Sequence, residues 1–294
     1  MTSIAIASGK GGAGKTSVSA ALARYLGPSA VLADCDVDAA NALIAMGATE
    51  LSRSDYSSGD GYVIYSSRCT GCGECARACR FGAIVSDSGT FRIDEALCER
   101  CGLCQDVCPS AALVTEQKHG GYLALSSTAC GSILSHAELV PGEDTSGKLV
   151  RKVRVQADEQ AKQRGADFVL IDAPPGIGCP VIASLSGVGL AVVVMEAGRS
   201  GMSDAARLFT LLSDMKIPSV VVINKSGLDP EMDKEARQTA EDARAPIVAQ
   251  LPFDARFRAS TEAGEAWTDA ADPWVREQAQ SLCEAILQRT RSMS

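Results

Sequence analysis

The residues whose types and spacing most clearly suggest chemistry form a glycine-rich run near the start of the chain, Gly9-Lys10-Gly11-Gly12-Ala13-Gly14-Lys15-Thr16. The run fits G-x-x-x-x-G-K-[ST], in which glycines let backbone N–H groups approach phosphate oxygens closely. In such a loop Lys15 reaches the β and γ phosphates of a nucleotide, and the Thr16 hydroxyl binds Mg²⁺. The apolar residues 3–7 predict a strand before the loop, and the Ala- and Leu-rich residues 17–26 predict a helix after it. Because a helix N-terminus also attracts anions, this order predicts a nucleotide site.

Eight cysteines form a second distinctive group, in two runs that share the spacing C-x₂-C-x₂-C-x₃-C. The runs are Cys69, Cys72, Cys75 and Cys79, and Cys98, Cys101, Cys104 and Cys108. The chain contains 12 cysteines in all and starts without a secretion signal, so we expect metal ligation or redox work rather than disulfides. Zinc is the competing interpretation, but zinc sites favour paired C-x₂-C knuckles over four-cysteine runs.

This double run resembles bacterial ferredoxins that hold two [4Fe–4S] clusters. In that arrangement three thiolates of one run occupy three corners of a cluster, and the fourth ligand comes from the other run. The resemblance implies one cluster on Cys69, Cys72, Cys75 and Cys108, and a second on Cys79, Cys98, Cys101 and Cys104. Arg80 departs from the pattern, because it stands where a proline would follow the last cysteine of the first run.

Lys10, directly after the first glycine of the loop, narrows the type of nucleotide site. With this residue the loop resembles the deviant Walker A ATPases, which include the Min-type positioning ATPases, the ParA-like partition ATPases and the nitrogenase iron protein. The resemblance implies that Lys10 contacts nucleotide across a dimer interface, so we expect an ATP-dependent homodimer. The alternative is an ordinary solvated lysine in a loop.

Two acidic strand ends match the nucleotide switches of this family. Asp36 follows the predicted strand 29–33, and the resemblance implies that it orients or deprotonates the attacking water and helps to hold Mg²⁺. Asp172 follows the predicted strand 168–171 and would hold Mg²⁺ through water, and the Gly176 N–H would sense the γ-phosphate. The resemblance therefore implies Lys10, Lys15 and Asp36 as catalytic residues and Thr16, Asp36 and Asp172 as the magnesium site.

The adenine base has two expected contacts in the second half of the chain. Asn224, at the end of the predicted strand 220–224, matches the position that reads the base edge in this family, and Pro252 would close the other side. The complete expected set of ATP contacts is Gly9, Lys10, Gly11, Gly12, Ala13, Gly14, Lys15, Thr16, Ser17, Gly176, Asn224 and Pro252.

Cys179 lies seven residues after Asp172. A cysteine with this spacing ligates a cluster shared between two subunits in the nitrogenase iron protein, so we hypothesise a dimer-bridging cluster on Cys179. The alternative is a buried or redox-silent thiol. Cys130 is the candidate for a second ligand to such a third cluster. We expect Cys35 and Cys283 in the core.

The order of the predicted strands and helices that position these residues indicates one α/β domain with an insertion. Near-continuous apolar runs at 191–196 and 220–224 are typical of parallel strands covered on both faces. Residues 51–60 are rich in Ser, Asp and Gly and predict a linker. We therefore predict a doubly wound, mostly parallel P-loop NTPase sheet, with an inserted α+β bacterial ferredoxin-like domain. The ATPase parts would span residues 1–61 and 119–294, and the insert residues 62–118.

The composition limits the partners. The chain has 294 residues, 46% of them hydrophobic and 22% charged, with a formal net charge of −8. This acidic balance argues against nucleic acid as the main partner, because phosphate binding needs clustered Lys and Arg. The longest apolar run, residues 188–195, is too short to span a bilayer. We expect a soluble, cytoplasmic protein without a nucleic-acid or membrane partner.

These patterns together predict a dimeric, Mg²⁺-dependent ATPase that couples ATP binding and hydrolysis to electron transfer through two [4Fe–4S] clusters. Its partner would be a redox or metal-centre acceptor protein. One alternative is an ATPase that assembles or carries iron–sulfur or other metal centres. A second alternative is a redox-sensing, positioning or partition-like switch.

Overall fold

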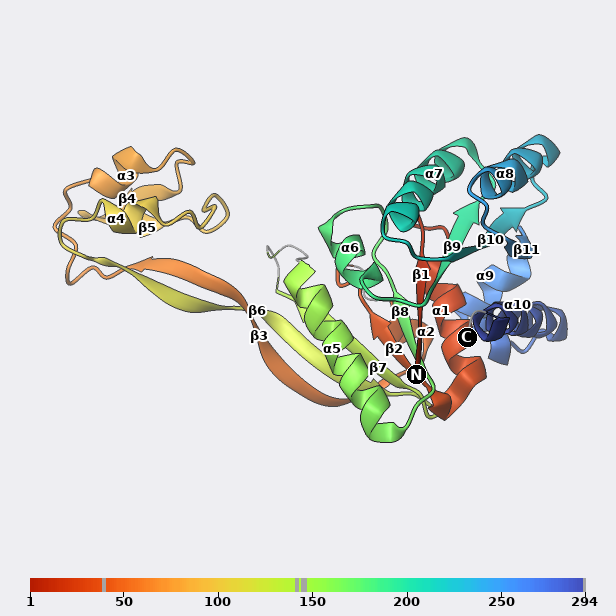
Figure 1. The fold of residues 1–294 in the computed structure, drawn as a ribbon. Helices are drawn as coiled ribbons and strands as arrows, with labels where there is room; N and C mark the ends of the chain where they lie inside the picture. The colour runs from red at the N-terminus through yellow and green to blue at the C-terminus, as the bar shows by residue number, and fades with distance from the viewer. Residues whose placement is uncertain (39–40, 141–142, 144–146, 293–294) are drawn as a thin grey trace. The chain divides into compact units, whose positions relative to one another are not determined.

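Nine strands in one sheet organise the fold, with the order β11-β10-β9-β1-β8-β2-β7-β6-β3 (Figure 1). The structure is a computed structural model that describes residues 1–38, 41–140, 143 and 147–292. Every neighbouring pair from β11 to β7 is parallel, so the predicted mostly parallel α/β sheet is confirmed. The strands are β1 (Thr2–Ala7), β2 (Ala30–Asp34), β3 (Thr49–Ile64), β6 (Leu113–Ser127), β7 (Ile133–Leu139), β8 (Phe168–Asp172), β9 (Leu190–Glu196), β10 (Ser219–Ser226) and β11 (Ile247–Pro252).

The chain divides into two compact units. The first comprises Met1–Ser54, Tyr122–Glu138 and Asp144–Ser294, and the second comprises Asp55–Gly121 and Leu139–Glu143. The predicted insert, residues 62–118, lies inside the second unit. Strands β3 and β6 each continue from one unit into the other along the chain.

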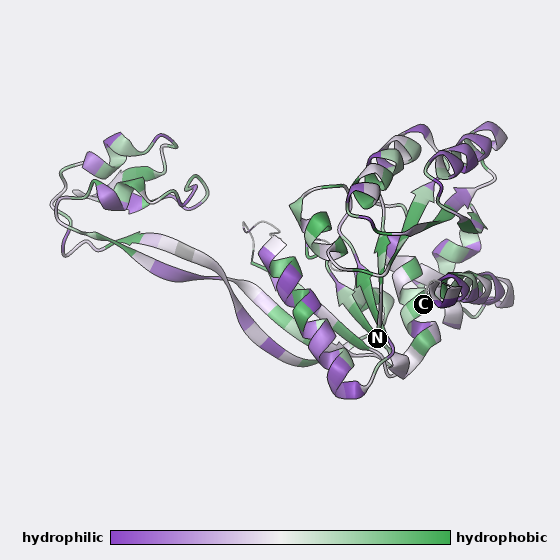
Figure 2. Ribbon diagram, viewed as in Figure 1, coloured by the Kyte–Doolittle hydropathy of each residue, from purple (hydrophilic) through white to green (hydrophobic). Residues whose placement is uncertain are grey.

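Helices cover the parallel strands of the first unit, and apolar residues are concentrated on those strands (Figure 2). The apolar stripe Val275, Ala279, Leu282 and Ile286 of the last helix is at most 1% exposed and packs with α1 and one face of the sheet. Asp272 caps this helix by accepting the N–H groups of Trp274 and Val275. The helices are α1 (Lys15–Leu26), α2 (Ala42–Ala45), α5 (Gly147–Arg164), α6 (Cys179–Leu185), α7 (Arg199–Asp214), α8 (Pro230–Asp242), α9 (Ala255–Glu262) and α10 (Pro273–Ser292), with short 3₁₀ turns η1 (Gly27–Ser29) and η2 (Trp267–Asp269).

The predicted linker over residues 51–60 is wrong, because β3 runs unbroken from Thr49 to Ile64. Its Ser, Asp and Gly residues carry little apolar signal, and pairing with β6 supplies the backbone hydrogen bonds that hold such a strand. Strand β7 extends the parallel part of the sheet beyond β2. Residues 141–142 and 144–146 lie outside the described residues.

The second unit repeats one local structure in each cysteine run. Helices α3 (Glu74–Ala78) and α4 (Leu103–Asp106) pack on one another, and each is preceded by a glycine in the left-handed conformation, Gly73 and Gly102. Strands β4 (Ile84–Asp87) and β5 (Thr90–Ile93) form an antiparallel pair. A small core gathers apolar side chains and cysteines from both runs, namely Ile64, Cys75, Ala76, Cys79, Ile84, Phe91, Ile93, Cys104, Cys108 and Leu113.

None of the helices among the described residues is both long and apolar enough to span a bilayer.

Candidate functional site

The glycine-rich loop joins β1 to α1 at the carboxyl edge of the parallel strands, where α/β sheets bind ligands. Gly14 has a φ of 99°, a left-handed conformation that favours glycine. A Cβ on Gly14 would lie 2.4 Å from Nδ2 of Asn224, and one on Gly9 would lie 2.2 Å from the carbonyl carbon of Asp204. The loop therefore needs glycine both for its turn and for close packing against its neighbours.

A cavity of about 890 Å³ opens beside this loop, within the size range of ligand pockets. It brings together the loop, the segment after β2 and the segment from Pro174 to Val181 after β8. Of the predicted ATP contacts, the cavity lining includes Gly11, Gly12, Gly14, Lys15, Thr16 and Ser17, and it also includes Asp36. Gly9, Lys10, Ala13, Gly176, Asn224 and Pro252 do not line it.

Asp172 ends β8 directly behind the loop and is fully buried. Neither of its carboxylate oxygens has a hydrogen-bond partner among the described residues. Burial raises its pKa to about 6, against the opposing effect of Thr16, Lys15 and Ser19 nearby. An unpartnered buried carboxylate is costly unless a cation neutralises it. Its position beside the Thr16 hydroxyl therefore fits a hard divalent cation such as Mg²⁺, which takes oxygen ligands from carboxylates, water and nucleotide phosphates.

Asp36 is half-buried on the cavity wall. Burial raises the pKa of its carboxyl group, while Lys15 lowers it and Asp38 raises it further. The Asp36 carboxyl group thus lies near the Lys15 ammonium on the wall of the cavity. Asp38 and Asn41 line the same wall. This arrangement permits Asp36 to contact a water molecule or a cation, and its role remains a prediction.

Asp34 is a site residue that the sequence analysis missed. It is the last residue of β2, lies beside Asp172 in the strand register and is 1% exposed. Burial, with the nearby charge of Asp172, raises its pKa well above the usual range. Its oxygens accept the backbone N–H groups of Asp36 at 3.1 Å and Ala42 at 3.2 Å. Asp34 therefore shapes the segment that carries Asp36, and its place at the end of a buried strand was the available signal.

Two residues at the end of β10 support the loop from outside the cavity. Nδ2 of Asn224 donates to the carbonyl of Ala13 at 2.9 Å, and Nζ of Lys225 donates to the carbonyl of Gly12 at 3.0 Å. Base recognition by Asn224 therefore remains a prediction, because its amide is engaged with the loop. Likewise the N–H of Gly176 donates to the carbonyl of Ser8 at 3.1 Å. Pro252 pairs with Ser226 at the end of β11.

Lys10 makes contacts within its own chain. Its Nζ lies 3.2 Å from Oε2 of Glu196 and donates to Oγ of Ser200 at 3.1 Å. Nζ of Lys225 lies 3.7 Å from the same carboxylate oxygen. Glu196 thus receives two cations that both touch the nucleotide loop, and sequence reasoning gave no signal for it.

The four cysteines predicted for the second cluster, Cys79, Cys98, Cys101 and Cys104, line one small cavity of the second unit, together with Tyr62, Phe81 and Ile93. Members of the predicted first set are also neighbours. Burial raises the pKa of the Cys75 thiol, and the nearby Cys108 and Cys69 add to this. Burial opposes ionisation of Cys108, but the Ser110 hydroxyl and the N–H of Ala112 outweigh it and lower the pKa.

No group of three or more His, Cys, Asp or Glu side chains among the described residues could hold a single metal ion. A [4Fe–4S] cluster differs from such a site, because each thiolate binds a different iron and the four sulfurs are spread around a cube. Cysteines of both runs around a common cavity, with N–H groups directed at sulfur, are compatible with that geometry.

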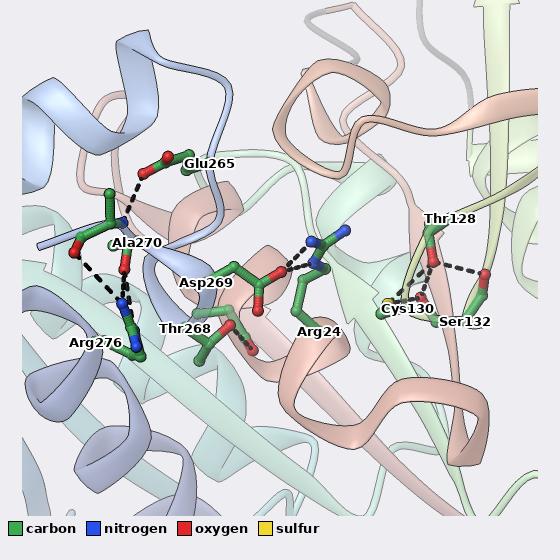
Figure 3. Close-up of polar contacts among 11 residues, drawn as sticks. Arg24, Thr128, Cys130, Ser132, Glu265, Thr268, Asp269, Ala270 and Arg276 are labelled. Carbon is green, nitrogen blue, oxygen red and sulfur yellow. Dashed lines mark hydrogen bonds and ion pairs between the residues drawn. The ribbon is translucent and has the colours of Figure 1, made fainter. Parts of the chain in front are cut away.

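The structure does not bring Cys130 and Cys179 together within one chain. Cys179 is exposed at the first turn of α6, after the carboxyl end of β8. Cys130 lies in the turn before β7, at the amino edge of the sheet, where its Sγ contacts the hydroxyls of Thr128 and Ser132 (Figure 3). The length of a five-residue strand, roughly 16 Å, separates these edges. Cys35 and Cys283 are buried in the core, as predicted.

Comparison with known proteins adds independent findings. A family model described as the CobQ/CobB/MinD/ParA nucleotide binding domain matches residues 4–267. The uncharacterized protein MJ0578 of Methanocaldococcus jannaschii is 36% identical over 228 residues, which cover 77% of this chain and 79% of that protein.

Two solved structures share the fold. The septum site-determining protein MinD of Pyrococcus horikoshii, complexed with Mg-ADP, superimposes with a TM-score of 0.60 at 17% identity, covering 100% of this chain and 98% of that one. The cell division ATPase MinD of Pyrococcus furiosus gives a TM-score of 0.58 at 18% identity, covering 98% and 99%.

Proposed function

Because the chain belongs to the CobQ/CobB/MinD/ParA nucleotide-binding family, we propose that it is a MgATP-hydrolysing protein that forms ATP-dependent homodimers and couples nucleotide turnover to iron–sulfur chemistry. The observation that carries the ATPase proposal is the cavity where the glycine-rich loop meets Asp36 and the segment after β8. A solved relative of this fold that holds Mg-ADP supports the choice of nucleotide.

In the proposed reaction, water attacks the γ-phosphorus in line with the bond to the β-phosphate oxygen, which breaks as the new bond forms. Asp36 orients the water and accepts its proton. The loop N–H groups and Lys15 bind the phosphate oxygens, and Lys10 contacts the nucleotide of the partner protomer. Thr16, Asp36 and Asp172 would hold Mg²⁺, which neutralises phosphate charge when bound.

Measurements of nucleotide binding and phosphate release test this assignment. Lys15→Ala should lose nucleotide binding, because it removes the cation that faces the phosphates. Asp36→Asn should retain binding but lower kcat by about 100-fold or more, as expected for loss of a general base. Asp167→Asn, which changes an exposed carboxylate directly before β8, serves as the matched control. Wild-type turnover by Asp36→Asn would refute the role of Asp36.

We further propose that the second unit holds two [4Fe–4S] clusters, on Cys69, Cys72, Cys75 and Cys108 and on Cys79, Cys98, Cys101 and Cys104. The convergence of the second set on one cavity supports the crossed ligand sets. Such clusters would supply one-electron chemistry. Iron and acid-labile sulfide analysis with EPR on anaerobically purified protein should give about eight iron atoms per chain. Stoichiometric zinc without iron would overturn the proposal.

In this proposal ATP turnover gates electron transfer from the clusters to an acceptor protein. The two cysteine runs of the second unit support it. A second candidate, a positioning or partition-like switch with a redox-sensing unit, is supported by the likeness to a septum site-determining protein. A third, assembly of metal centres, rests on Cys179 alone.

Three outcomes separate these candidates. Electron transfer requires that ATP accelerate oxidation of the pre-reduced clusters by an acceptor, followed by their visible absorbance. A positioning switch instead gives ATP-dependent co-sedimentation with DNA or anionic vesicles. An assembly factor transfers iron to an apo-acceptor and loses that ability in Cys179→Ser. The absence of any ATP effect on cluster oxidation would overturn electron transfer.

A further inference from the structure

Glu196 lies at the end of a strand, beside the nucleotide loop. It is the last residue of β9 and is paired in register with Asn224 of β10. Its carbonyl accepts the N–H of Gly198 at 2.9 Å, and a Cβ on Gly201 would lie 2.6 Å from the same oxygen. The start of α7 therefore packs closely on the Glu196 backbone and holds this residue in place.

The side chain of Glu196 faces two cations from different segments. Its Oε2 lies 3.2 Å from Nζ of Lys10 and 3.7 Å from Nζ of Lys225. Ser200, in the first turn of α7, accepts a further hydrogen bond from Lys10 at 3.1 Å. The ammonium group of Lys10 is thus held by a carboxylate and a hydroxyl of its own chain.

A lysine held in this way cannot at the same time serve a nucleotide bound to another protomer. One ammonium group is a compact charge on a single stem, so a contact across an interface competes with the contact to Glu196. The carboxylate is fixed by β9 and α7, so Lys10 is the partner that must move. Breaking this ion pair costs free energy, and that cost makes dimer formation less favourable.

We propose that Glu196 is a positioning residue that retains Lys10 within its own protomer and thereby sets how tightly two ATP-loaded protomers associate. This inference rests on the proposed ATP-dependent dimer. A purely structural role makes the opposite prediction, because loss of Glu196 would then disorder the loop and weaken both nucleotide binding and association.

The test uses the full-length, anaerobically purified protein with magnesium and a non-hydrolysable ATP analogue. Sedimentation velocity measures the dimer dissociation constant of wild type, Glu196→Gln and the control Glu235→Gln, an exposed charge loss on α8. A dimer contains two copies of the Lys10–Glu196 ion pair, one in each protomer, and each is partly exposed. Because the variant removes both, Glu196→Gln should tighten association by about 5- to 30-fold. Ser200→Ala should shift it in the same direction by a smaller factor. Association no tighter than wild type in Glu196→Gln would overturn the proposal.

A second readout follows Lys10 directly in the protein without nucleotide. Trace labelling of amines, followed by mass spectrometry of the Lys10 peptide, should show faster modification in Glu196→Gln than in wild type or Glu235→Gln. Unchanged labelling would also overturn the inference, because Lys10 would not be retained by Glu196. If neither wild type nor variant dimerises with bound analogue, the proposed dimer itself fails, and the labelling still reports whether the ion pair exists.

Discussion

The buried carboxylate of Asp172 should make the protein more stable when its charge is removed in the absence of magnesium. Burial raises its pKa from 3.8 to about 6, a change that corresponds to about 3 kcal/mol between the two protonation states. Asp34 lies beside it and shares the effect. Replacing Asp172 by Asn should therefore raise the free energy of unfolding by about 2 to 3 kcal/mol at pH 7.5 in EDTA.

The pH dependence identifies the cause of this gain. Between about pH 4 and 6 the folded chain keeps a proton that the unfolded chain releases, so the free energy of unfolding falls as pH rises. The cost of the charged form is complete only above the folded pKa of about 6. The advantage of Asp172→Asn should thus shrink to about half at pH 5.

Thermal unfolding monitored by circular dichroism gives the measurement. Asp167→Asn, at the exposed residue directly before β8, is the control. The expected rise in Tm for Asp172→Asn at pH 7.5 is about 4 to 10 °C for a unit of this size. Added MgADP should then stabilise wild type and have little effect on Asp172→Asn. A variant no more stable than wild type in EDTA, or equally favoured at both pH values, would refute the argument from burial.

Three further predictions concern other parts of the molecule. Gly14→Ala should abolish nucleotide binding and lower Tm, because Gly14 has a φ of 99° and a Cβ would lie 2.4 Å from Asn224, whereas binding at wild-type affinity in a calorimetric titration would contradict this. Asp34→Ala should be less stable than Asp34→Asn by about 1 to 3 kcal/mol, because both variants lose the buried charge but only Ala leaves two backbone N–H groups without their acceptor; equal urea midpoints for the two variants would argue against it. Cys98→Ser should lower the iron content from about eight to about four per chain, and unchanged iron would exclude Cys98 as a ligand.

Local patterns predicted the parts of the site that are made of consecutive residues. The P-loop, the cavity-lining Lys15 and Thr16, and the strand end at Asp172 all follow from short runs whose conformation depends on near neighbours. The two cysteine runs were equally visible, because each is a tight turn that sets the spacing of its own thiols. The linker prediction for residues 51–60 failed, because their Ser, Asp and Gly composition does not show that they pair with β6 along the strand β3.

The remaining features depend on strand order and register, which bring together residues far apart in the sequence. Asp34 lies beside Asp172 only because β2 and β8 are adjacent and in that register. Glu196 meets Lys10 only because β9 neighbours β1, which delivers the loop.

The sequence by itself thus determined which chemistry this chain can carry, a phosphate-binding loop and two runs of metal-ligating cysteines, because these are properties of short segments. Only the tertiary structure decided which distant residues contact the phosphate-binding loop and which cysteines lie near one another. It placed Asn224 beneath the loop and Cys130 at the opposite edge of the sheet from Cys179. The physical reason is that hydrogen bonds and ion pairs act over a few ångströms, and only folding brings distant segments within that range.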